Sequence, residues 1–112
     1  MATLNYAHMP VQHIRERAER RLGHTDHLMM VIIDLYDGPT SQPDPPHSHP
    51  HEQVSYVAAG ELILVMGEEK TRLSAGDLFT VPANAPHAIQ TLSPHVRVID
   101  AFHPIREDFL KR

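Results

Sequence analysis

Histidines gather in one short stretch of this chain, residues 45–60, which read PPHSHPHEQVSYVAAG. His47 and His49 stand two positions apart, and an extended strand would place both imidazoles on the same face. A third histidine, His87 in APHAIQ, is distant in the sequence and can complete the set. Imidazole nitrogens bind zinc, copper, iron and nickel. The spacing therefore predicts a divalent metal held inside a β-structure.

Two polar residues, Glu52 and Gln53, follow the histidines and offer a further ligand. In a regular strand they point to opposite faces, so only one of them joins the histidines, and a β-bulge would exchange them. His51, in the same stretch, is not assigned as a ligand. The alternative is a histidine-rich surface loop with adventitious metal affinity. It is less favoured because a strand-like run follows the cluster and His87 lies downstream.

Length and composition narrow the possible functions. The chain has 112 residues, the length of one domain, and it has no cysteine, which excludes disulfides, thiolate zinc sites and a cysteine nucleophile. A net charge of −4 favours neither nucleic acid nor an anionic membrane as a partner. No apolar stretch reaches the roughly 20 residues that span a bilayer, and no signal peptide is evident, so we expect a cytoplasmic protein.

Prolines and glycines divide the sequence into short apolar runs that are typical of strands. The segment 11–22 fits a helix or a strand, and 37–46 has the composition of a loop. Gly60 is expected to turn the chain, with 61–66 running back as the next strand. About seven or eight short strands at such spacing predict an all-β sandwich or barrel. The expected strands are 27–36, 53–59, 61–66, 70–73, 78–81, 87–92 and 95–102.

These residues resemble the two motifs of the cupin family. The first motif, a His-x-His pair, an acidic or amide residue and a glycine, is matched by His47, His49, Gln53 and Gly60. The second, a glycine, a proline and a histidine, is matched by Gly76, Pro82 and His87. The resemblance implies a cupin-type double-stranded β-helix, or jelly-roll barrel. A single domain would span 1–112, with motifs at 45–60 and 76–90 and a flexible N-terminal arm at 1–10.

The motif match also implies a ligand set for one divalent transition metal ion, which would be nickel, zinc, manganese or iron. The ligands would be His47, His49, Gln53 and His87. Gln53 stands where the family usually has a carboxylate, and Glu52 is the alternative ligand if the strand bulges. Asn84 stands where glycine is frequent, and asparagine tolerates the positive φ that this turn requires.

The C-terminal segment 100–110, DAFHPIREDFL, resembles the ending of the KdgF family of small cupins, which act on unsaturated uronates from pectin and alginate. Asp100, Phe102 and Arg106 match pocket residues of that family. The resemblance implies metal-dependent conversion of 4,5-unsaturated monouronates to linear keto-uronates, an isomerase reaction. Asp100 would be the general acid or base, Arg106 would hold the substrate carboxylate, and Phe102 would contact the sugar acid.

Side chains alternate between the two faces of the last predicted strand, and this places Asp100 on the apolar face that points into the barrel. Residues 96, 98, 100 and 102 share one face, and 97, 99 and 101 share the other. A carboxylate on an apolar face is unfavourable unless it is paired or functional. The structural alternative is that Asp100 caps the strand or forms an ion pair with Arg97 or Arg106. Phe102 would then be a core residue, and Arg106 a solvated arginine beside Glu107 and Asp108.

Three other functions stay open on the same residues: a cupin dioxygenase, a non-catalytic sugar-binding cupin, and another sugar isomerase or epimerase. The expected partner is a small sugar acid rather than a nucleic acid or a membrane. Because HLMMVIIDLY at 27–36 is apolar on both faces, we also expect a homodimer that pairs through edge strands.

Overall fold

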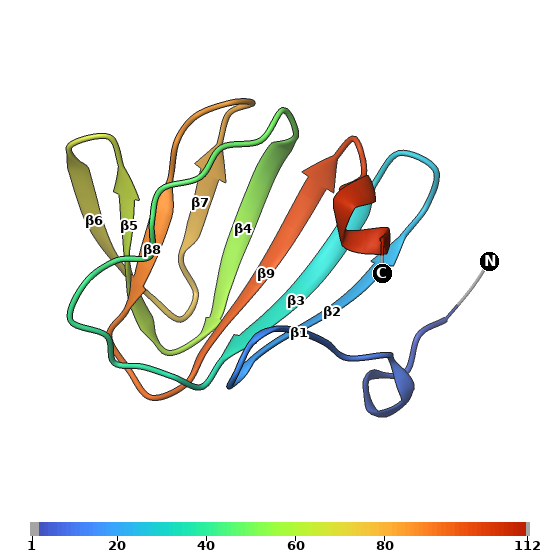
Figure 1. Cartoon of the computed structure of the whole chain (residues 1–112), viewed down its shortest axis with the longest axis horizontal. Helices are drawn as coiled ribbons and strands as arrows, with labels where there is room; N and C mark the ends of the chain where they lie inside the picture. The colour runs from blue at the N-terminus through green and yellow to red at the C-terminus, as the bar shows by residue number, and fades with distance from the viewer. Residues whose placement is uncertain (1–2, 112) are drawn as a thin grey trace.

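The computed structural model describes residues 3–111, which form nine β-strands and two short 3-10 helices (Figure 1). The elements are η1 (Tyr6–His8), β1 (Gln12–Arg15), β2 (Ala18–His24), β3 (Met29–Leu35), β4 (Glu52–Ala59), β5 (Glu61–Met66), β6 (Glu69–Ser74), β7 (Leu78–Val81), β8 (Ala88–Thr91), β9 (Val96–His103) and η2 (Glu107–Leu110). Within 3–111, no helix is long and apolar enough to cross a membrane.

The strands form two antiparallel sheets. The larger has the order β1-β2-β3-β9-β4-β7 and the smaller has the order β6-β5-β8. In Figure 1 the smaller sheet lies on the left and the larger one extends to the right. Apolar side chains of both sheets form the main core, among them Val57, Leu62, Phe79 and Val98. The two packed sheets confirm the predicted all-β jelly-roll architecture. Two layers are needed because each sheet buries one apolar face against the other.

The predicted strands are also confirmed, with boundaries that differ by one or two residues. The ambiguous segment 11–22 forms β1 and most of β2, joined by a tight turn in which Arg17 has a φ of 63°. Asn84 has a φ of 67°, as expected from its position in the second motif, and its N–H donates to the carbonyl of His49 at 2.7 Å. This bond ties the second motif to the first.

Gly60 does not make a hairpin between its two neighbouring strands. β4 pairs with β7 and β9, whereas β5 pairs with β6 and β8, so the chain passes at Gly60 from one sheet to the other. Its φ is +80°, and a Cβ there would lie 2.2 Å from the carbonyl oxygen of His95. Glycine is therefore required by both the backbone conformation and the close approach of another strand.

Strand β9 lies in the middle of the larger sheet, and its buried and partly exposed residues alternate as predicted. Its residues 96, 98, 100 and 102 are buried, whereas Arg97, Ile99 and Ala101 are partly exposed on the outer face. Asp100 is paired in register with Val31 of β3 and Ser55 of β4. The carboxylate of Asp100 thus projects from the centre of the sheet toward the inside of the barrel.

The N-terminal segment lies against the outer face of the larger sheet. The ring of Tyr6 stacks under the guanidinium of Arg21 at 4.3 Å, and its hydroxyl accepts a hydrogen bond from Arg97 at 3.0 Å. Of the predicted arm at 1–10, residues 1–2 lie outside the described residues. The flexibility of the remainder stays a prediction.

Candidate metal centre and its pocket

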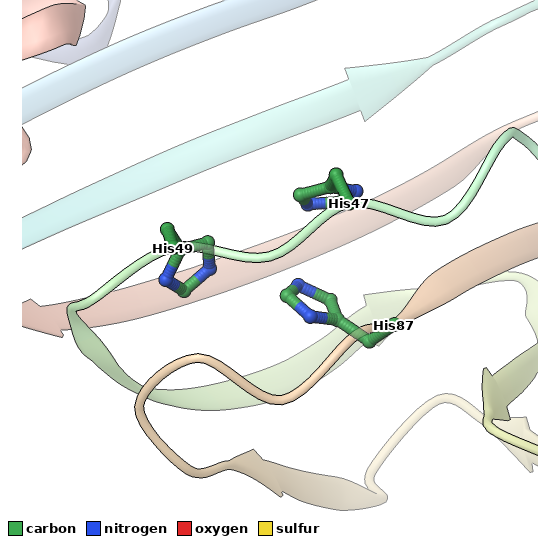
Figure 2. Close-up of side chains that lie close together, drawn as sticks. All are labelled: His47, His49 and His87. Atoms are coloured by element: carbon green, nitrogen blue, oxygen red, sulfur yellow. The ribbon is translucent and has the colours of Figure 1, made fainter.

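Three histidines from two distant segments converge at one end of the barrel. One ligand nitrogen from each of His47, His49 and His87 can be chosen so that all three lie within 4.8 Å of one another. Figure 2 shows His47 and His49 on the loop before β4 and His87 just before β8, with their rings around a common space. The spacing of the His-x-His pair and the distant His87 therefore predicted this cluster.

The backbone that carries the pair is extended but is not part of a regular strand. His47 forms a single bridge with His87, with N–H to O distances of 3.0 and 2.9 Å, and β4 begins only at Glu52. Pro46 and Pro50 flank the pair and have no N–H, so a continuous ladder cannot form there. The bridge holds two of the candidate ligands directly opposite each other.

Backbone carbonyls orient two of the imidazoles. The Nδ1–H of His49 donates to the carbonyl of His51 at 3.0 Å, and that of His87 donates to the carbonyl of Ala85 at 2.9 Å. In the neutral imidazole this leaves Nε2 with a free lone pair, the form that a metal ion binds. His51 thus contributes its backbone oxygen, and its side chain is outside the cluster.

Gln53 faces the histidines, whereas Glu52 is exposed at the start of β4. The Oε1 atom of Gln53 lies 3.0 Å from Nε2 of His49. Because Nδ1 of His49 is already a donor, these two atoms present lone pairs to each other. Metal–nitrogen and metal–oxygen bonds of about 2.0–2.2 Å would allow one cation to bind both atoms. The donor set therefore fits a divalent transition metal ion.

The surroundings of His47 and His49 favour the neutral form of both imidazoles. Burial lowers the pKa of His47, and the nearby imidazoles of His87 and His49 lower it further. Burial also lowers the pKa of His49, with a further contribution from the positive charge of Arg106. Metal binding requires deprotonated ligands, so these shifts prepare the cluster for a cation near neutral pH.

A chain of buried hydrogen bonds connects the histidines to Asp100. The amide nitrogen of Gln53 donates to Oγ of Ser55 at 2.9 Å, and the Ser55 hydroxyl donates to Oδ1 of Asp100 at 2.5 Å. Burial raises the pKa of Asp100 to about 6, although the Ser55 hydrogen bond and the charge of Arg106 oppose the shift. Asp100 is only 5% exposed. A carboxyl group of this kind can exchange a proton near neutral pH.

Two histidines of the cluster, His47 and His87, line one cavity of about 260 Å³ inside the barrel together with Asp100, whereas His49 lies behind its wall. Its wall combines polar groups from both motifs with apolar side chains of both sheets, such as Ile33, Phe79 and Ile89. The predicted site residues in this wall are His47, Gln53, His87, Asp100, Phe102 and Arg106. A mostly apolar pocket with a few convergent polar groups is the usual form of a small-molecule site.

Comparison with known proteins agrees with this architecture. Residues 37–102 match the cupin domain family. The chain belongs to the cupin family. The pectin degradation protein KdgF of Dickeya dadantii is 38% identical over 87 residues, which cover 77% of this chain and 76% of that protein. The motif resemblance found in the sequence is thereby confirmed.

Solved structures of other cupins superpose closely on this one. KdgF from Halomonas sp. matches with a TM-score of 0.86 and 32% identity, covering 96% of this chain and 99% of that chain. An RmlC-like cupin from Shewanella frigidimarina matches with a TM-score of 0.83 and 31% identity, covering 95% and 93%. The chain is thus a KdgF-like cupin with a histidine triad suited to a metal ion.

The ion pairs proposed as the structural alternative for Asp100 are not formed in this cupin. Arg97 lies on the opposite face of β9, where its Nε donates to Asp34 at 2.8 Å. Arg106 makes two parallel hydrogen bonds to Asp108, with Nε–Oδ1 at 3.1 Å and Nη2–Oδ2 at 2.9 Å. Asp100 therefore has no cation of residues 3–111 within ion-pair distance.

Phe102 and Arg106 close the same side of the cupin pocket. Phe102 is buried and packs its ring against His49 and Phe109, with centroid distances of 5.6 and 5.9 Å, so it is both a core residue and a pocket wall. The guanidinium of Arg106 lies 5.1 Å from the Phe102 ring and 4.2 Å from the Phe109 ring. Arg106 is therefore not a solvated surface arginine, and its side chain is 12% exposed.

The predicted site residues did not include Ser55, which donates to Asp100, or Arg20 and Phe109, which line the cupin pocket. Ser55 follows Gln53 by two positions on β4, so strand alternation alone could have placed it on the inner face. Arg20 lies in the segment that fitted both a helix and a strand, and its side-chain direction was therefore undetermined. Phe109 reaches the pocket only because η2 folds back over β9, which no local pattern indicates.

Proposed function

We propose that this cupin converts 4,5-unsaturated monouronates, derived from pectin or alginate, into linear keto-uronates. The observation that carries the proposal is Asp100, a buried carboxyl group with a raised pKa that faces the same cavity as His47 and His87. The similarity to KdgF of Dickeya dadantii, whose name describes pectin degradation, supports the same substrate class. The protein would then be an isomerase of sugar acids.

The chemistry of this substrate suits the groups in the pocket. An unsaturated uronate contains an enol ether, and its linear form becomes a ketone only when protons move between oxygen and carbon. Asp100 would exchange these protons as a general acid and base. The Ser55 hydroxyl, which donates to Oδ1, would hold the carboxyl group in place and leave Oδ2 to face the substrate.

The candidate metal ligands would contribute a localised positive charge. His47, His49, Gln53 and His87 are all neutral donors, so a divalent ion held by them would keep its full charge. When bound, such an ion supplies Lewis acidity that stabilises negative charge on a substrate oxygen. We propose nickel, zinc, manganese or iron, because imidazole and amide donors accept each of them.

The remaining pocket residues would position the sugar acid and exclude water. Phe102 would form an apolar wall beside the sugar ring. The sequence predicted that Arg106 holds the substrate carboxylate, for which its planar fork is suited. In the free protein Arg106 is paired with Asp108, so a substrate carboxylate must displace Asp108 or bind beside it.

The test is the ultraviolet absorbance of an unsaturated monouronate in the presence of the metal-loaded protein, the chelated protein, and the chelated protein with metal restored. We expect metal-dependent loss of the double-bond absorbance without oxygen consumption. Oxygen uptake would instead indicate a cupin dioxygenase. A metal-loaded protein that binds the uronate and leaves it unchanged would be a binding cupin, and a conserved double bond with altered stereochemistry would indicate an epimerase.

We also propose that the protein is a homodimer. Leu28 and Met30, in the run that is apolar on both faces, are 60% and 57% exposed. A second copy would cover such side chains, which a monomer leaves in water. Sedimentation equilibrium of the wild type and of Met30→Lys tests this, because a monomeric wild type would contradict the proposal.

A further inference from the structure

A second arginine of the pocket, Arg20 on β2, has not been assigned a role. It lines the same cavity as Asp100 and Arg106. Its guanidinium carbon lies 3.7 Å from the centroid of the Phe109 ring, and its Nε donates to Oε1 of Gln12 at 2.8 Å. Gln12 in turn donates to the carbonyl of Phe109 at 2.9 Å. Arg20 is thus held in position by a neutral amide and an aromatic ring.

The three arginines of the cavity wall differ in how their charge is balanced. Arg106 is paired with Asp108, and Arg15 with Asp37 at 2.7 Å and Asp44 at 3.7 Å. Arg20, by contrast, has no carboxylate of residues 3–111 within 4.0 Å. It is therefore the cavity arginine whose charge is not neutralised by direct contact.

The surroundings of Arg20 make this charge unfavourable without an anion. Burial lowers the pKa of Arg20, and the positive charge of Arg106 lowers it further, while the negative charge of Asp108 opposes the shift in part. The guanidinium nevertheless stays protonated at all physiological pH values. An anion in the cavity would relieve the repulsion between these two cations.

We propose that Arg20 is the principal carboxylate-binding residue of this pocket and makes the cupin selective for sugar acids over neutral sugars. Nε donates to Gln12, and within residues 3–111 the two terminal nitrogens make no side-chain hydrogen bond, so this edge can donate two parallel hydrogen bonds to one carboxylate. Arg106 then acts mainly as the cation that stacks on Phe102 and Phe109. The inference rests on the proposed function and deepens it by naming the group that recognises the acid.

The test compares two substitutions with a matched control. Arg20→Met removes the charge and keeps the aliphatic stem against Phe109, whereas Arg20→Lys keeps the charge and removes the planar fork. Arg72→Met is the control, because Arg72 is a 70% exposed arginine of β6 that pairs with Glu61 outside the pocket. Thermal unfolding and metal content are measured for each variant, so that loss of folding is separated from loss of binding.

The readout is calorimetric binding of D-galacturonate and of neutral D-galactose to the metal-loaded proteins, beside turnover of the unsaturated monouronate. We expect the wild type and Arg72→Met to prefer galacturonate. Arg20→Met should bind it about 10- to 100-fold more weakly, the usual effect of losing a charged hydrogen-bonded pair, and Arg20→Lys should be intermediate. In turnover, the loss should be larger in KM than in kcat.

The two proposals fail in different ways. Equal binding of galacturonate by the wild type and Arg20→Met, or no binding by the folded wild type, would overturn the assignment of Arg20. A larger loss of binding in Arg106→Met than in Arg20→Met would overturn it as well. Absence of turnover in a wild type that binds galacturonate through Arg20 would instead overturn the proposed reaction and leave the carboxylate site in place.

Discussion

Two buried carboxylates, Asp34 and Asp100, lie on opposite faces of the same sheet and have opposite electrostatic surroundings. Asp34 on β3 is 0% exposed on the outer face and accepts hydrogen bonds from Arg97 and His95, the latter at 2.7 Å. Burial alone would raise its pKa, but the hydrogen bonds from Arg97 and His95 outweigh burial and hold the pKa below its ordinary value. Asp100 accepts a hydrogen bond from the neutral Ser55 hydroxyl, and burial raises its pKa to about 6.

The contrast shows that partners, rather than burial, decide what a buried carboxylate does. Asp34 is neutralised by cations that cover it, so its role is to join β3, β9 and the N-terminal segment. Asp100 faces a cavity without a direct cation, so its proton remains available for chemistry. Substitution of each residue should therefore change a different property of the protein.

The largest effect is expected from Asp100→Asn, which keeps the shape and removes the titrating group. Turnover of the unsaturated monouronate should fall about 10²- to 10⁴-fold, the usual contribution of a general acid or base. Metal content and thermal unfolding should stay close to those of the wild type, because Ser55 can still donate to the amide oxygen. Metal loss that parallels the loss of activity would make Asp100 a support of the metal site instead.

Asp34→Asn is expected to lower stability and to leave activity unchanged. The substitution leaves Arg97 and Arg21 without their buried carboxylate, and the free energy of unfolding should fall by about 3 kcal/mol. Activity per folded molecule should be retained, since the outer face does not contribute to the cavity. Urea denaturation beside turnover at a temperature where both proteins are folded checks this. A specific loss of kcat in a folded variant would show that the two faces are coupled.

The pH dependence of stability sharpens the comparison. The pKa of Asp34 is lower in the folded protein than its ordinary value of 3.8. Its stabilising contribution is therefore fully present above pH of about 4, and it is lost as the pH falls through the lower folded-state pKa. Urea denaturation between pH 5 and 2.5 should show a steeper acid loss of stability in the wild type than in Asp34→Asn. Parallel curves would assign the acid sensitivity to other carboxylates.

The smallest effect is expected from Tyr6→Phe. It removes the hydroxyl that accepts from Arg97 and keeps the ring that stacks on Arg21, so stability should fall by about 0.5–1 kcal/mol. The loss should largely disappear in the Asp34→Asn background, because the Arg97 guanidinium is no longer held there. Denaturation of the two single variants and the double variant measures this coupling, and additive losses would contradict it.

Much of the fold and of the candidate site could be predicted from local patterns. Strand alternation placed Asp100 and Phe102 on the inner face of β9, and the motif spacing selected His47, His49 and His87. Such predictions succeed because side-chain direction in a strand depends only on parity along the chain. They need no knowledge of which strands are neighbours.

The predictions that were wrong or left open concern contacts between segments that are distant in the sequence. Gly60 was expected to turn the chain back, but β4 and β5 belong to different sheets, since each finds its partners elsewhere in the barrel. The helix-or-strand segment 11–22 became β1 and β2, and only then did Arg20 reach the pocket.

The sequence by itself determined which residue types are available and which face of each strand carries them, because both are local properties of the chain. Tertiary structure decided their partners. It placed Arg97 on Asp34, 63 positions apart, Ser55 on Asp100, 45 positions apart, and Arg20 in the cavity. Whether a buried carboxylate has a cation beside it is decided only when the strands pair. This pairing makes Asp34 a structural carboxylate and leaves Asp100 available for chemistry.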